Sequence, residues 1–121
     1  MTGATEMRIE RIVLAVERMD EMARFYDEVF GTALQSDAGS PFRRGTLADI
    51  PLLLCPNEIA EVVAQQNRHQ LRFAVDDLDA VLGRVRATGG VVMDEGELGD
   101  SARVAGVADP DGNTYELVAA R

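Results

Sequence analysis

The chain has 121 residues, 46% of them hydrophobic, which is enough for one domain with a buried core. It carries 21 acidic and 12 basic residues, for a formal charge of −9, and every basic residue is an arginine. The absence of lysine excludes Schiff-base chemistry. A single His and a single Cys exclude an internal disulfide and a Cys/His zinc site within one chain. The acidic balance argues against nucleic acid as a partner.

The sequence favours a reducing compartment and shows no membrane segment. No apolar run approaches the roughly 18 residues that would cross a bilayer. Residues 1–10 lack the basic and apolar regions of a signal peptide. A lone cysteine, Cys55, fits a reducing environment. We therefore expect a cytoplasmic protein that has no contact with membranes.

The chain contains an internal repeat, which begins with a strand in each copy. Residues 12–34 align without a gap on residues 71–93, 59 positions further on. Each copy opens with apolar residues at every second position, a period that predicts a strand with one buried face. The alternating residues are Ile12, Leu14 and Val16 in the first copy, and Leu71, Phe73 and Val75 in the second.

An amphipathic helix is predicted after each of these strands. Apolar residues follow the i, i+3, i+4, i+7 spacing of one helix face. Acidic residues lie near the start of each helix, where they complement its dipole, and each helix ends at glycine, Gly31 or Gly89–Gly90. The apolar faces are Met19, Met22, Ala23 and Tyr26 in the first copy, and Leu78, Val81, Leu82 and Val85 in the second.

Three short strands are predicted after each helix. They cover 33–37, 42–47 and 50–55 in the first half, and 91–94, 103–108 and 114–118 in the second, with a turn at 109–112. A short helix is predicted within 57–67. The fold class is therefore α+β, with two βαβββ units that form a curled mixed-sheet cup. We expect a single domain over 1–121, made of repeats at about 8–56 and 69–121 and joined by the linker 57–68.

The doubled unit resembles the vicinal oxygen chelate superfamily, which includes glyoxalase I, extradiol dioxygenases, and bleomycin- and fosfomycin-resistance proteins. The segments that carry the resemblance are LAVERMDEMARFYDEVFG at 14–31, FAVDDLDAVLGRVRATGG at 73–90 and DPDGNTYEL at 109–117. It covers nearly the whole chain, and the last segment is its most specific signature. The resemblance implies a cup that holds a ligand or metal, and chains that commonly pair as homodimers.

The resemblance also implies four metal-ligand positions, and this chain fills one of them. Glu116 matches the carboxylate of the last strand. Arg11 and Gln70 stand at the first and third positions, and the second falls among the leucines of the strand 50–55. A guanidinium repels a divalent cation and leucine cannot bind one. We therefore expect no cofactor; a divalent metal is possible but disfavoured.

The alternation of the strands predicts what lines the cup. If Ile12 and Phe73 face their helices, then the floor is formed by Arg11, Gln70, Arg72 and Glu116, together with leucines. Arginine presents a planar fork that suits carboxylates and phosphates, so one arginine could bind an anionic ligand while Glu116 neutralises the other. Alternatively, Glu116 forms a buried ion pair with Arg11 or Arg72 that closes an empty cup.

Two other reactive side chains have simpler interpretations. His69 lies one residue from the third ligand position, and a bulge in that strand would be needed to bring it inside, so we interpret it as a surface residue. Cys55 closes an apolar strand and is interpreted as a small core residue. If a metal is present, Glu116 and His69 are its candidate ligands.

Three functions remain open on this basis. The leading hypothesis is a metal-independent protein, similar to the bleomycin-resistance branch, that binds a small molecule, with anionic compounds as candidates. The second is a metal-dependent lyase or isomerase of glyoxalase type that uses Glu116 with His69 or a ligand from a partner chain. The third is an inert remnant of the fold that acts through protein contacts. No catalytic residue can be named from the sequence, so whether the protein is an enzyme stays undecided.

Overall fold

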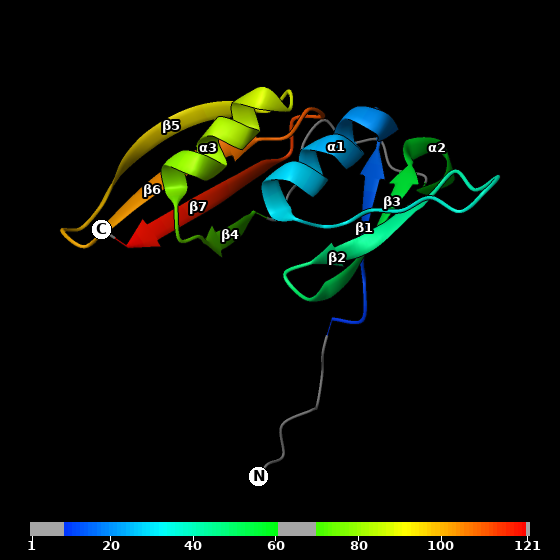
Figure 1. Cartoon of the computed structure of the whole chain (residues 1–121), viewed down its shortest axis with the longest axis horizontal. Coiled ribbons are helices and arrows are strands. Elements are labelled where there is room, and N and C mark those ends of the chain that lie inside the picture. The colour runs from blue at the N-terminus through cyan, green and yellow to red at the C-terminus, as the bar shows by residue number, and fades with distance from the viewer. Residues whose placement is uncertain (1–8, 61–69, 121) are drawn as a thin grey trace, which may run out of the picture.

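The computed structural model describes residues 9–60 and 70–120 (Figure 1). The first repeat forms β1, α1, β2 and β3, the short α2 follows, and the second repeat forms β4, α3, β5, β6 and β7. In chain order the elements are β1 Ile12–Val16, α1 Met19–Phe30, β2 Arg43–Leu47, β3 Ile50–Pro56, α2 Asn57–Ala60, β4 Leu71–Ala74, α3 Leu78–Ala87, β5 Val91–Leu98, β6 Ala102–Ala108 and β7 Thr114–Ala120.

The strands form two open mixed sheets, one for each repeat. The first has three strands in the order β1-β3-β2, and the second has four in the order β4-β7-β6-β5. In both, the first strand of the repeat pairs in parallel with the last one, β1 with β3 and β4 with β7. The α+β class and the doubled unit predicted from the sequence are confirmed. The predicted helix within 57–67 begins as α2, and its residues 61–67 lie outside the described part of the chain.

The predicted strand at 33–37 is wrong: it is reduced to a single bridge between Gln35 and Arg44. Ala33 has a φ of 53°, which breaks an extended strand. The carboxylate of Asp27 accepts hydrogen bonds from the Thr32 hydroxyl at 2.8 Å and from the Leu34 backbone N–H at 2.7 Å. The Asp27 side chain of α1 therefore binds the residues that follow the helix and holds them in a tight loop.

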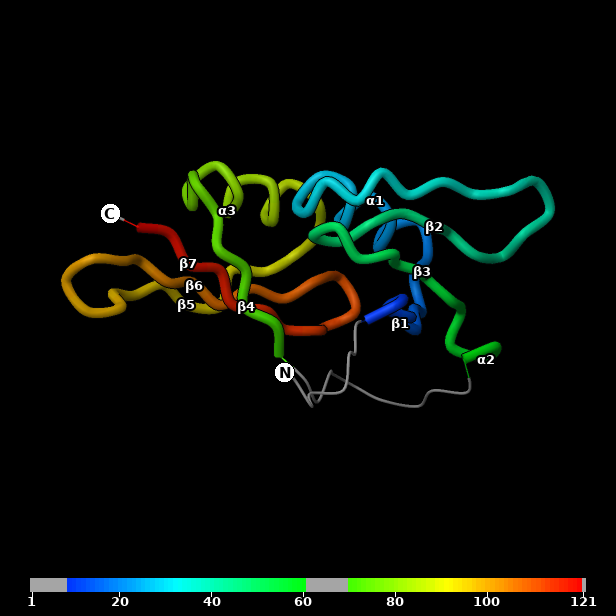
Figure 2. The backbone as a smooth tube through the Cα atoms, turned by 90° about the horizontal axis from the view of Figure 1, so that it is seen from below, coloured from blue at the N-terminus to red at the C-terminus, as the bar shows by residue number. Residues whose placement is uncertain are grey.

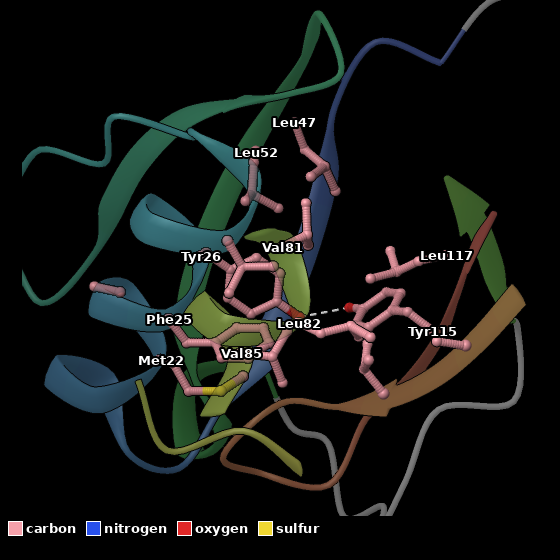
Figure 3. Packing of buried hydrophobic residues seen from close by; sticks show 14 of the residues in the cluster. Met22, Phe25, Tyr26, Leu47, Leu52, Val81, Leu82, Val85, Tyr115 and Leu117 are labelled. Carbon is pink, nitrogen blue, oxygen red and sulfur yellow. Dashed lines mark hydrogen bonds between the residues drawn. The ribbon is translucent and has the colours of Figure 1, made fainter. Parts of the chain in front are cut away.

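The two helices end and begin largely as the sequence predicts. Gly31 has a φ of 65° and caps α1 in the left-handed conformation, while the Asp77 side chain caps α3 by accepting from the Ala80 N–H at 3.1 Å. One buried cluster contains residues from both repeats, including Phe25 and Tyr26 of α1 and Leu117 of β7 (Figure 3). Within 9–60 and 70–120, no helix has the length and apolar character needed to cross a membrane.

The four-stranded sheet has one covered and one open face. Figure 2 shows α3 on one side of β5, β6 and β7. Residues 105, 107, 115, 117 and 119 point to this side and are all buried. The alternate residues of β6 and β7, from 102 to 120, are only half-buried or exposed. The open face is therefore accessible across all four strands.

Gly90, between α3 and β5, is required by close packing. A Cβ atom built there would lie 2.4 Å from the Phe25 ring, 2.7 Å from the carbonyl oxygen of Ala108 and 2.9 Å from a methyl group of Val85. Since Phe25 and Val85 are fully buried, neither can move aside. We expect Gly90→Ala to lower the free energy of unfolding by about 2 kcal/mol in urea melts. Gly83→Ala, on open surface of α3, is the control and should not destabilise the protein.

Candidate functional site

The open face of the four-stranded sheet carries an ion pair between two of the residues predicted to line the cup. Arg72 of β4 and Glu116 of β7 are direct partners in the strand register. The Nε and Nη2 atoms of Arg72 both lie 3.1 Å from Glu116 Oε1. Their side chains are 48% and 36% exposed, so the alternative of a buried pair closing the cup is wrong. An exposed pair of this kind contributes about 0.5 kcal/mol to stability.

The other predicted residues lie at the start of the two repeats. Gln70 donates from Nε2 to the Thr114 hydroxyl at 2.9 Å, beside the ion pair. Arg11 is exposed, immediately before β1 of the other sheet, and no contact joins it to Gln70, Arg72 or Glu116 within the described residues. The structure therefore brings together three of the four predicted cup residues. His69 lies outside the described residues.

Asp94 is a further polar residue of this face, which sequence reasoning missed. It lies opposite Gly106, which lies opposite Glu116, so the three share one row across the sheet. Asp94 Oδ1 accepts from the Gly106 backbone N–H at 3.0 Å, and a Cβ atom at Gly106 would lie 2.8 Å from that oxygen. A bulge between Val92 and Asp94 shifts the register by one residue, and simple alternation cannot reveal such a shift.

The row next to these polar residues is apolar. Strand register places Ala74, Val118 and Val104 side by side on the open face, followed by a row that ends in Leu98. Leu98 is 42% exposed, and Val104 and Val118 are only half-buried. The open face thus combines an apolar floor with a few polar side chains, which is the usual composition of a small-molecule site.

The donor set of this face does not fit a divalent metal. Glu116, the one residue that matches a family ligand position, is engaged by a guanidinium. In the first sheet, Leu53 is the register partner of Val13, two residues after Arg11, and therefore faces the same side as Arg11. Among residues 9–60 and 70–120, no three His, Cys, Asp or Glu side chains are grouped so that they could hold a metal ion. Cys55 is buried, as expected for a core residue.

A separate polar cluster lies on the covered side, in the core between the repeats. The Tyr26 hydroxyl of α1 donates to Asp109 Oδ2 at 2.7 Å. It also lies 2.5 Å from the Tyr115 hydroxyl of β7, a contact that Figure 3 marks with a dashed line. Burial raises the pKa of Tyr26 well above its usual value, with further contributions from the other two groups. Burial also raises the pKa of Tyr115 to about 12 and raises that of Asp109. Tyr115 points away from the open face, as the strand alternation predicts.

Comparison with protein-family models identifies the family of the chain. Residues 11–118 match the family model described as a glyoxalase-like domain. The chain belongs to this family. Its membership confirms the resemblance to the vicinal oxygen chelate superfamily that the repeat and the DPDGN segment indicated. Comparison with curated proteins gave no significant match.

Solved structures with the same fold come from several bacteria. A glyoxalase/bleomycin resistance protein/dioxygenase family enzyme from Burkholderia phytofirmans PsJN is 19% identical, with a TM-score of 0.76 and coverage of 93% of this chain and 98% of that one. The fosfomycin resistance protein FosX from Listeria monocytogenes is 16% identical, with a TM-score of 0.77 and coverage of 95% and 94%. The antibiotic binding protein TnmS3 from Streptomyces sp. CB03234 is 22% identical, with a TM-score of 0.68 and coverage of 98% and 99%. At these identities the likeness shows the fold.

Proposed function

We propose that this glyoxalase-like protein binds a small polar or anionic molecule without a metal, on the open face of its four-stranded sheet. The observation that carries the proposal is the Arg72–Glu116 pair, which lies exposed beside an apolar floor on a sheet face that no described element covers. An ion pair worth about 0.5 kcal/mol has little structural value, whereas two oriented polar groups above apolar surface can fix the orientation of a ligand. The antibiotic binding protein TnmS3 shares the fold, which is consistent with this function.

An anionic ligand needs a positive charge that is not already paired, and we propose that Arg11 provides it. Arg72 is engaged by Glu116, whereas Arg11 has no ion-pair partner among the described residues. Arg11 lies immediately before β1 of the three-stranded sheet, whereas Arg72 belongs to β4 of the four-stranded sheet. We therefore propose that the protein is a homodimer in which the cup is completed between repeats of one chain or of two. Sedimentation velocity tests the dimer, and a monomer at micromolar concentration would contradict it. The cytoplasmic location stays a prediction.

Ligand binding should depend on the ion pair, while stability should not. A thermal-shift screen of small anionic, neutral and cationic compounds provides the probes. We expect the compounds that stabilise the wild type to lose at least tenfold in affinity with Arg72→Gln, whereas Glu116→Gln, which releases the Arg72 guanidinium, should strengthen the binding of anionic compounds. The control is Arg24→Gln, which breaks a comparable exposed pair with Glu28 at 3.0 Å on α1. All three variants should unfold within about 0.5 kcal/mol of the wild type.

Metal titration separates binding from glyoxalase-type catalysis. With Mn²⁺, Ni²⁺ or Zn²⁺ in a calorimeter, we expect no uptake at micromolar affinity. Uptake of one ion per chain that disappears with Glu116→Ala would overturn the metal-independent proposal and favour the lyase or isomerase alternative. Failure of every compound in the screen, together with a lack of metal binding, would favour the inert remnant.

A further inference from the structure

An open cavity of about 180 Å³ lies where the two repeats meet, apart from the ion pair described above. Its walls come from the end of α1, the turn between β2 and β3, and the edge strand β4, which lie beside one another in Figure 1. Its lining residues are Val29, Phe30, Leu47, Ala48, Phe73, Ala74 and Val75. None of these side chains is polar or charged, so the cavity favours an apolar group.

Two phenylalanine rings form part of the wall. The ring centroids of Phe30 and Phe73 lie 4.7 Å apart at an interplanar angle of 41°, and both residues are only half-buried. Aromatic rings pair favourably in tilted and edge-to-face arrangements at such distances. A third ring that enters the cavity would therefore meet an aromatic surface. An engineered apolar cavity of about 150 Å³ is enough to bind benzene, so this space suits one six-membered ring.

The open edge of β4 adds hydrogen-bonding groups. Among the strands of residues 9–60 and 70–120, β4 is an edge strand whose one partner is β7. Val75 donates its backbone N–H to the Val118 carbonyl oxygen at 2.9 Å and so points toward β7. Backbone groups of successive strand residues point in opposite directions, so the N–H and C=O of Ala74 point to the open edge. A ligand at this edge can therefore both accept and donate one hydrogen bond.

Acidic residues that neighbour two of the lining residues in the sequence disfavour anions. Asp49 follows the lining residue Ala48, and Asp76 follows the lining residue Val75. Both aspartates are exposed. The turn that carries Asp49 is fixed, because Ala48 and Asp49 have φ values of 49° and 68°, as in the tight turns of hairpins. A carboxylate ligand in the cavity would therefore lie near two like charges.

From these features we propose that the cavity binds a small uncharged aromatic molecule that bears a carboxamide or hydroxyl group. The ring lies against Phe30 and Phe73, and the polar substituent bonds to the backbone of Ala74. This site shares Ala74 with the apolar row of the open face but contains neither Arg72 nor Glu116, so it does not depend on the ion pair of the proposed function.

Benzamide tests the proposal by amide NMR of the intact protein. We expect saturable shift changes, with a millimolar Kd, that are largest at the amides of Phe30, Ala48 and Ala74. Benzoate and cyclohexanecarboxamide should each bind at least fivefold more weakly, because the first adds a negative charge and the second lacks the aromatic ring. Equal affinity for all three compounds, or the absence of saturable shifts at these amides, would overturn the proposal.

A matched pair of variants locates the site. Ala74 and Ala120 are both exposed alanines of the four-stranded sheet, and only Ala74 lines the cavity. Ala74→Leu should weaken benzamide binding at least tenfold, whereas Ala120→Leu should leave it unchanged. Equal effects of the two substitutions would contradict the proposal. Arg72→Gln should retain benzamide binding even where it abolishes binding on the open face, so either proposal can fail without the other.

Discussion

Replacing Asp109 with alanine should lower the free energy of unfolding by about 3 kcal/mol, the largest effect we expect from a single substitution. Asp109 is 3% exposed, and its carboxylate accepts four hydrogen bonds. Oδ1 accepts from the N–H groups of Asp111 at 3.0 Å and Asn113 at 2.9 Å. Oδ2 accepts from Asn113 Nδ2 at 2.9 Å and from the Tyr26 hydroxyl at 2.7 Å. Alanine would leave these donors without a partner in the core, which urea melts would report as a lower midpoint.

Asp109→Asn is the matched control, and its effect should be smaller, about 1 kcal/mol. The amide keeps one oxygen for the two backbone N–H groups, and its NH₂ can donate to the Tyr26 oxygen if Tyr26 donates to Tyr115. Burial raises the pKa of Asp109, so the contribution of this carboxyl is fully present below its unfolded pKa and is lost as the pH rises through the folded pKa. The advantage of the wild type over Asp109→Asn should therefore narrow as the pH rises from about 4. Equal stability of the alanine and asparagine variants would contradict this account of the cluster.

The fold could be predicted from the sequence because its strongest signals are periodic and occur twice. The alternation in β1 and the helical spacing in α1 and α3 arise from buried faces, and in β4 the half-buried Phe73 lies between exposed neighbours, so the same periods survive in the pattern of apolar residues. The strand predicted at 33–37 does not form, because the Asp27 side chain reaches past the end of α1 and sets the conformation of this segment. The strand propensities of the residues within 33–37 do not reveal a contact with a side chain of the preceding helix.

The site was predicted in part, for a related reason. Arg72 and Glu116 are direct partners in the register of β4 and β7. Their side chains therefore lie on the same face of the sheet, as the alternation of apolar and polar residues predicted. Their exposure depends on what covers the sheet, which the strand pattern does not specify. Asp94 was missed because the bulge beside it changes which residues of β5 reach the open face. Contacts between Arg11 and the other three residues were expected from the family's cup, and the two sheets of one chain do not provide them among the described residues.

The second large effect is expected at alkaline pH, where the two buried tyrosines should make stability fall steeply. Tyr26 and Tyr115 have pKa values raised by burial, well above normal for Tyr26 and to about 12 for Tyr115. A group with a raised folded pKa keeps its full contribution below its unfolded pKa, near 10, and loses it as the pH rises through the folded value. Ionisation of the two tyrosines in the unfolded chain should therefore lower the free energy of unfolding progressively as the pH rises from 10 to about 12.

These two residues are the only tyrosines in the chain, and it has no tryptophan, so ultraviolet absorbance of the phenolate reports on this cluster alone. Because burial holds the pKa values of both hydroxyls well above 10 in the folded protein, they should ionise when the core opens, and the absorbance should rise together with the loss of helical circular dichroism in one transition. Tyr26→Phe removes one of the two ionising groups and should roughly halve the slope of stability against pH above pH 10. A phenolate signal that appears near pH 10 while the helices remain intact would show that the cluster is open to solvent. It would also mean that the hydroxyl groups do not hold the two repeats together.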